Sequence, residues 1–212
     1  MNKKLILSAL ISSMFVPVLA LAAQKSLVSY LSLDTEKGLT NTVSWDAKKI
    51  GGAHNGTVTI SSAEVTLDSK KGITGGTVTM DMKTIASVDL EKDTTSKEKL
   101  ETHLKSADFF DVEKNPTAVF TIKSVTGVKG KKGKVLIKGD LLMKGVSHGV
   151  NALATWKKNS DGKYSLVSDS FKLDRTQWGV KFGSSLLENV KDRFIEDMIN
   201  LKVSLNLFIP KA

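Results

Sequence analysis

The side chains best suited to metal binding or acid–base chemistry are three histidines, His54, His103 and His148. No two of them stand at the short spacing that is typical of a metal-binding motif. His103 falls on the apolar face of a predicted helix, where a hydrogen-bonded structural histidine is the more common role. His54 begins a predicted strand and His148 lies at a turn, so each either contacts the head group of a ligand or caps the backbone. The histidine pattern therefore predicts no metal site.

The densest cluster of polar and aromatic side chains is residues 174–179, with the sequence DRTQWG. The planar guanidinium of Arg175 suits a phosphate group. The neighbouring Asp174 points instead to a structural ion pair. Trp178 either plugs one end of a barrel or lies against a ligand. The sequence leaves the structural role and the ligand-binding role open for this cluster.

Other motifs of enzyme chemistry are missing from the sequence. There is no nucleophile elbow with a Ser-His-Asp order, and no glycine-rich phosphate loop that follows a strand and opens a helix. Asp108 and Asp111 flank two phenylalanines and are predicted to be turn residues. The chain has 0 cysteines, which excludes disulfides, thiolate chemistry and a lipid-modified N-terminal cysteine. We therefore predict that the protein is not an enzyme and needs no cofactor, with an envelope enzyme as the less favoured alternative.

The N-terminal segment has the pattern of a secretory signal. Lys3 and Lys4 precede a mostly apolar run at residues 5–19, and small residues at 20–22 form a cleavage site. We expect residues 1–22 to be removed, which leaves residues 23–212 as one domain in the periplasm. The formal net charge of +9 falls to +7 without the two lysines. This charge favours transient contact with anionic membrane surfaces, although the lysines are spread along the chain and also fit a hydrated surface. Aromatic residues make up 6%, too few for base-stacking platforms, so no nucleic-acid partner is expected.

Apolar and polar residues alternate over most of residues 23–212, a pattern that predicts a succession of β-strands. Many alternating strands with short turns indicate an all-β fold, an antiparallel sheet with one dry face. Closing that sheet into a barrel removes its exposed edges, and a sandwich is the alternative. Residues 84–95 and 175–193 are predicted to be connections. The predicted strands are residues 28–33, 43–50, 54–61, 65–68, 76–83, 116–125, 134–144, 148–156, 164–174 and 200–209.

One helix interrupts the strands. It is predicted to begin after the capping residues 93–96 and to end at Lys105. Phe109 and Phe110 follow directly, and adjacent aromatic residues point in different directions. We expect this pair to anchor the helix-bearing connection over the barrel.

The apolar faces of the predicted strands carry many slim or flexible side chains, such as Val58, Met80 and Ala152. If these faces line a closed barrel, the side chains alone leave a void that a long apolar ligand would fill. A solid interior is the alternative. The residues predicted to contact the tail of such a ligand are Val58, Ile60, Val78, Met80, Phe120, Ile122, Leu141, Met143, Phe171, Leu173 and Trp178.

Five segments, in their order and spacing, resemble the YceI-like proteins. The clearest is residues 100–120, which contain the run HLKSADFFDV followed by NPTAVF. The others are residues 43–57, 72–82, 135–148 and 174–184. The departures are small: Gly149 stands where the family usually has proline, and Met143 where it usually has isoleucine. The resemblance covers nearly all of residues 23–212.

The resemblance implies an extended, antiparallel, lipocalin-like β-barrel that holds a polyisoprenoid chain in an exported protein, often a homodimer. The function expected is binding of a long-chain isoprenoid or related amphiphilic lipid, as a periplasmic carrier, a store or a stress-linked protein. Four basic side chains are candidates for contact with a polar head group: Arg175, His54, Lys144 and His148. The alternative is a periplasmic interaction protein whose barrel is solid and serves as a scaffold.

Overall fold

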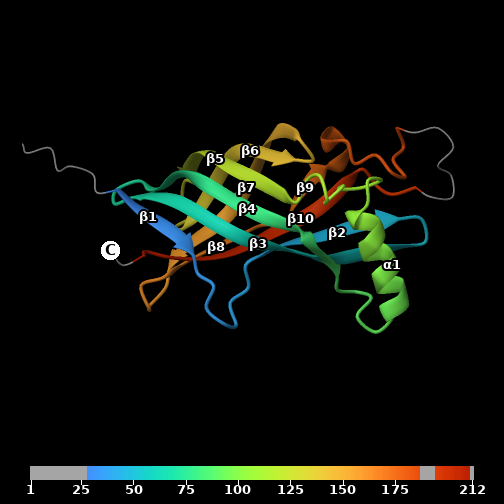
Figure 1. The fold of residues 1–212 in the computed structure, drawn as a ribbon. Coiled ribbons are helices and arrows are strands. Elements are labelled where there is room, and N and C mark those ends of the chain that lie inside the picture. Colours follow the sequence, from blue (N-terminus) through green and yellow to red (C-terminus); the bar gives the residue numbers. More distant parts are fainter. Residues whose placement is uncertain (1–27, 187–193, 211–212) are drawn as a thin grey trace, which may run out of the picture.

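The computed structural model describes residues 28–186 and 194–210. The expected signal segment, residues 1–22, lies outside the described residues. Ten strands, one α-helix and one short 3₁₀ helix follow one another in the described chain (Figure 1). The elements are β1 (Val28–Leu33), β2 (Thr42–Lys49), β3 (Gly52–Asp68), β4 (Gly72–Ser87), α1 (Thr94–Lys105), β5 (Thr117–Gly127), β6 (Lys134–Met143), β7 (Val146–Lys158), β8 (Tyr164–Ser168), β9 (Phe171–Asp174), η1 (Arg175–Trp178) and β10 (Met198–Phe208).

The strands form one antiparallel sheet that closes on itself. From β2 to β8 each strand pairs with the next in sequence, and β10 closes the ring by pairing with β2 on one edge and with β8 and β9 on the other. Two positions in the ring are each shared by a pair of strands. Strand β3 pairs with β2 along one stretch of its length and with β1 along the next. Strand β10 likewise pairs with β9 along one stretch and with β8 along the next. The predicted lipocalin-like barrel is confirmed, as a closed but uneven ring.

The position shared by β8 and β9 is explained by the local sequence. Residues 164–174, predicted as one strand, are two, because the chain leaves the sheet at residues 169–170. Val203 of β10 lies between the residues that pair with β8 and those that pair with β9. Its backbone N–H donates to the Oγ of Ser168, 2.8 Å away, so a serine side chain satisfies the backbone donor at the break.

Register shifts in β3 decide which of its residues face inward. The pairing of β3 with β4 slips between Ile60 and Ser62, as expected for a bulge. Buried positions therefore change from even numbers, such as Val58 and Ile60, to odd numbers, such as Ala63 and Val65. The bulge breaks the alternation in the sequence. For this reason residues 54–61 and 65–68 were predicted as two strands, whereas the structure has one, β3.

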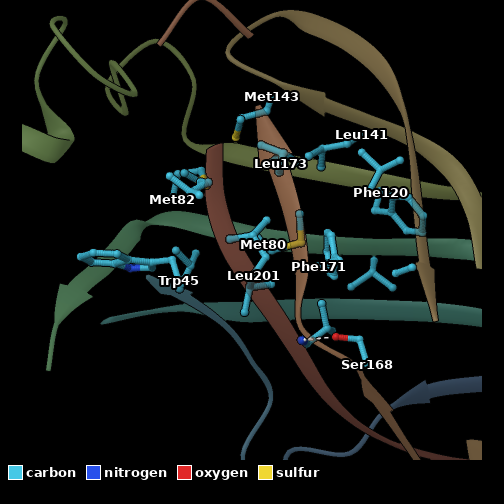
Figure 2. Close-up of a pocket in the computed structure, with 18 of the residues that line it drawn as sticks. Trp45, Met80, Met82, Phe120, Leu141, Met143, Ser168, Phe171, Leu173 and Leu201 are labelled. Carbon is cyan, nitrogen blue, oxygen red and sulfur yellow. Dashed lines mark hydrogen bonds between the residues drawn. The ribbon is translucent and has the colours of Figure 1, made fainter. Parts of the chain in front are cut away.

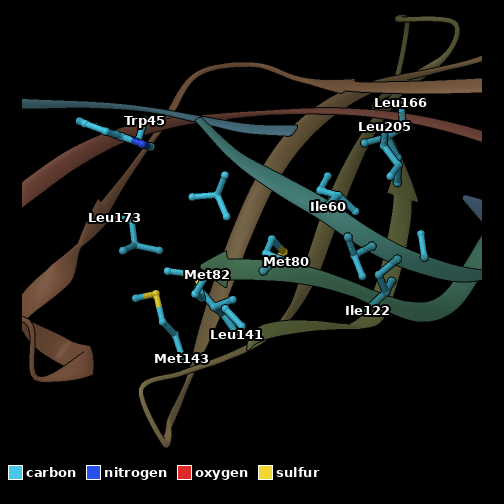
Figure 3. Packing of buried hydrophobic residues seen from close by; sticks show 14 of the residues in the cluster. Trp45, Ile60, Met80, Met82, Ile122, Leu141, Met143, Leu166, Leu173 and Leu205 are labelled. Atoms are coloured by element: carbon cyan, nitrogen blue, oxygen red, sulfur yellow. The ribbon is translucent and has the colours of Figure 1, made fainter. Parts of the chain in front are cut away.

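The buried apolar side chains form one continuous cluster along the barrel axis. Figure 3 shows Trp45, Met82, Met143 and Leu173 towards one end of this cluster, with Leu166 and Leu205 towards the other. Figure 1 shows α1 at one end of the elongated barrel and β1 at the opposite end.

Helix α1 begins and ends as its sequence predicts. The side chain of Asp93 accepts a hydrogen bond from the backbone N–H of Ser96, and Ser106 is the C-cap. Strand β4 is the main difference from the expected elements, because it continues to Ser87 through a stretch predicted to be a connection. Ile85 in this extension is buried. Within the described part of the chain, no helix is long and apolar enough to span a bilayer.

Candidate functional site

An apolar cavity runs through the interior of the barrel (Figure 2). Its volume is about 210 Å³, measured as the space that the centre of a water-sized sphere can reach. Every strand from β2 to β10 contributes side chains to its wall, as do α1 and the connection that follows it. Apart from Ser168 and Arg175, the lining residues are apolar or aromatic.

The volume is large enough to matter for folding. At about 24 cal/mol per Å³, an empty cavity of 210 Å³ costs about 5 kcal/mol. The net stability of a typical domain is about 5–15 kcal/mol. Apolar cavities of this kind stay dry, so water does not recover the lost contacts. An apolar ligand therefore has a substantial free energy to gain in this barrel.

All but two of the residues predicted to contact a ligand tail line the cavity. They are Val58, Val78, Met80, Phe120, Ile122, Leu141, Met143, Phe171 and Leu173. Because their placement follows from strand alternation, the inward faces could be identified from the sequence. Their contact with a ligand stays a prediction.

The two exceptions are Ile60 and Trp178, which are buried but do not border the cavity. Ile60 belongs to the packed part of the core. The indole Nε1 of Trp178 donates to the carbonyl oxygen of Leu141, 2.9 Å away, and its ring meets that of His148 edge to face. Trp178 thus fastens the η1 segment to β6 and β7.

Arg175 lines the cavity, yet its guanidinium is fully occupied by the protein. It is buried, and its five N–H groups donate to the carbonyl oxygens of Val180, Phe182, Ile195 and Glu196 and to the carboxylate of Asp197. Burial lowers the pKa of Arg175, and the carboxylates of Asp197 and Asp174 oppose that shift. Asp174, the partner suggested by the sequence, instead caps η1 through the N–H of Thr176.

The other three candidates for head-group contact also have protein partners. Lys144 Nζ donates to the carbonyl oxygens of Ala107 and Phe109, and His148 Nε2 lies 3.0 Å from the carbonyl oxygen of Gln177. His54 Nδ1 lies 2.8 Å from a carboxylate oxygen of Asp89. None of the three lines the cavity. Their shared feature is that they hold connections to the barrel.

The connection after α1 closes over the cavity. Phe109 and Phe110 both border the cavity, Phe109 being the more deeply buried. The rings of His103, Phe109 and Phe182 contact one another, with centroids 4.6–5.2 Å apart. This aromatic cluster joins the two long connections at the α1 end. The structural role expected for His103 matches these contacts.

Many lining residues were not identified from the sequence as site residues, and Trp45 and Ile85 are two of them. Trp45 lies on the inward face of β2 with Val43 and Ala47, so the alternation of β2 was the signal available for it. Ile85 was hidden in a stretch that reads as polar. Within residues 28–186 and 194–210, no three metal-ligating side chains gather in one place.

The sequence profile of the YceI-like domain matches residues 32–207. The chain belongs to the YceI-like family. The match begins in β1 and ends in β10, so it spans the whole ring of strands. A comparison with curated proteins finds none that matches.

Solved structures of the family's fold are similar to this barrel. BcnA of Burkholderia cenocepacia has 19% identity and a TM-score of 0.61, covering 78% of this chain and 95% of its own. A Campylobacter jejuni YceI protein has 22% identity and a TM-score of 0.52, covering 71% and 81%. A polyisoprenoid binding domain from Saccharophagus degradans has 11% identity and a TM-score of 0.59, covering 87% and 100%. At these identities the likeness supports the fold.

Proposed function

We propose that this YceI-like protein binds a long-chain isoprenoid or a related amphiphilic lipid in its barrel. The observation that carries the proposal is the apolar cavity along the barrel axis, whose wall is contributed by nine successive strands. Burial of apolar surface, worth about 25 cal/mol per Å², would supply most of the affinity. The structural likeness to a domain described as polyisoprenoid-binding supports the same class of ligand.

The lining favours an elongated chain over a compact ligand. Lining residues reach from Trp45 and Met143 towards one end of the buried cluster to Leu166 and Leu205 towards the other (Figure 3). Met80, Met82 and Met143 are unbranched and polarizable, so they adapt to the irregular outline of a branched chain. A carrier or storage role in the periplasm is the setting that we propose, with transient contact at a membrane surface during exchange.

Native mass spectrometry of protein purified without detergent tests the proposal. We expect a population with one bound apolar molecule, which organic extraction removes and added polyprenol restores. Bare protein that takes up no polyprenol after extraction and refolding would support the scaffold alternative instead. Fractionation of the producing cells tests the location, and retention of the uncleaved chain in the cytoplasm would contradict the periplasmic setting.

A further inference from the structure

Trp45 carries a buried hydrogen-bond donor that has no acceptor. The residue is 9% exposed and its ring lines the cavity. Its indole Nε1 is closed off from water and has no hydrogen-bond partner among the described residues. A buried tryptophan N–H usually finds a partner, and leaving a donor unpaired opposes folding. By contrast, Nε1 of Trp178 is paired with a carbonyl oxygen.

The position of the Trp45 ring is fixed by its neighbours. Trp45 pairs with Gly56 of β3 on one side and with Leu201 of β10 on the other. A Cβ atom at Gly56 would lie 2.6 Å from Cζ2 of Trp45 and 1.8 Å from the carbonyl oxygen of Ala86. Only glycine therefore lets the ring lie against β3 in this way. The edge of the ring that carries Cζ2 is therefore packed against the backbone at Gly56.

The cavity that Trp45 lines has flexible side chains in its wall, which can rearrange around a ligand. Trp45 shares the cavity wall with Met80 and Met82, which Figure 2 labels. Methionine has three rotatable bonds and repacks readily. Repacking of these side chains is the route by which we expect a ligand oxygen to reach the indole N–H.

The charges in the lining decide which kind of acceptor belongs there. Arg175 is the one cation among the described lining residues, and all five of its N–H groups are already used. Ser168, the other polar lining residue, accepts from the N–H of Val203. A phosphate placed inside the cavity would therefore be buried without a free counter-charge, which is strongly unfavourable.

From these observations we propose that Trp45 Nε1 donates a hydrogen bond to an uncharged oxygen at the polar end of the ligand, that of an alcohol, a carbonyl or an ester. This inference rests on the proposed function and deepens it. A single polar contact in an apolar pocket fixes which way round the chain lies. The polar end of the ligand lies at Trp45 and the chain extends towards Leu166 and Leu205.

Three probes with the same branched carbon skeleton test the inference: phytol, phytyl phosphate and phytane. Their affinities are measured by calorimetry for delipidated wild type, Trp45→Phe and Trp156→Phe. Trp156 stacks on Tyr164 and does not line the cavity, so it is a matched control. In wild type and in Trp156→Phe, we expect phytol to bind about 3- to 10-fold more tightly than phytane, since a net hydrogen bond is worth that much. In Trp45→Phe the advantage of phytol should be lost or reversed, because its buried hydroxyl then has no partner.

The wild-type protein also tests the contact without any substitution. The chain has 3 tryptophans, so ¹H–¹⁵N spectra show three indole N–H signals. Phytol should move the Trp45 signal downfield and slow its exchange with solvent, whereas phytane should not move it downfield.

The possible results separate the two proposals. If none of the probes binds, lipid binding fails and the Trp45 contact fails with it. If phytol and phytane bind equally to all three proteins, lipid binding stands and the Trp45 contact is overturned. Tighter binding of phytyl phosphate than of phytol would overturn the uncharged head group.

Discussion

Filling the cavity with one of the protein's own side chains should stabilise the lipid-free barrel and block lipid uptake. Ala152 of β7 is suited to this change. It lines the cavity, and its side chain is only half-buried although it faces inward. Because Ala152 borders the cavity, Ala152→Phe places a phenyl ring in that space.

The expected magnitude follows from the cavity volume. The empty space costs about 5 kcal/mol, worked from 210 Å³. A benzene ring fits a cavity of about 150 Å³, so one ring occupies much of this space. Strain from an imperfect fit costs about 1–3 kcal/mol. The net gain should be about 1–3 kcal/mol, which raises the Tm of a chain of this size by about 2–10 °C.

The assay is thermal unfolding of delipidated protein, followed by uptake of polyprenol. Leu153→Phe is the control, because Leu153 is the next residue along β7 and is 41% exposed on the outer face. The control should leave both Tm and uptake close to wild type. If Ala152→Phe lowers the Tm and binds polyprenol as wild type does, the space beside Ala152 is not the lipid site and the reasoning is refuted.

Three further substitutions test the parts of the fold that surround the cavity. Arg175→Met should destabilise the protein by about 3–5 kcal/mol in urea unfolding, because it leaves a partly buried carboxylate and four carbonyl oxygens without this donor; a loss below 1 kcal/mol would mean that the guanidinium is not structural. Gly56→Ala should destabilise the barrel and shift the near-ultraviolet circular dichroism of Trp45, since its Cβ would overlap the backbone at Ala86; an unchanged spectrum and stability would contradict the close contact. Burial opposes ionisation of Asp89, but hydrogen bonds led by that of His54 outweigh it and lower the pKa of this carboxyl. The stabilisation is then present above the unfolded pKa of about 3.9 and is lost as the pH falls through the folded value, so Asp89→Asn should flatten the loss of stability below about pH 4; an unchanged slope would count against this pairing.

Strand alternation made much of the fold predictable. Most strands lie within a few residues of their expected ranges, because inward apolar and outward polar residues alternate along them. The extension of β4 to Ser87 was missed, since polar residues surround its one buried aliphatic side chain, Ile85. The split between β8 and β9 was missed too, because Phe171 and Leu173 continue the apolar spacing across the break.

The tail-facing wall could be predicted, but the polar contacts could not. Inward faces follow from local alternation, whereas the partners of Arg175 lie on segments up to 22 residues away in sequence. From the sequence, an arginine in such a cluster is compatible both with phosphate binding and with a structural role. The two roles can be distinguished only when the acceptors of its N–H groups are known. The unpaired N–H of Trp45 is still harder to foresee, because a missing partner is visible only once the surroundings of the ring are known.

The most direct test of the central claim is a crystal structure of the protein purified without detergent. We expect continuous density of an elongated apolar molecule in the cavity bordered by Phe120, Leu141 and Leu201, shown in Figure 2. An interior closed by the protein's own side chains, with no density between them, would contradict the account.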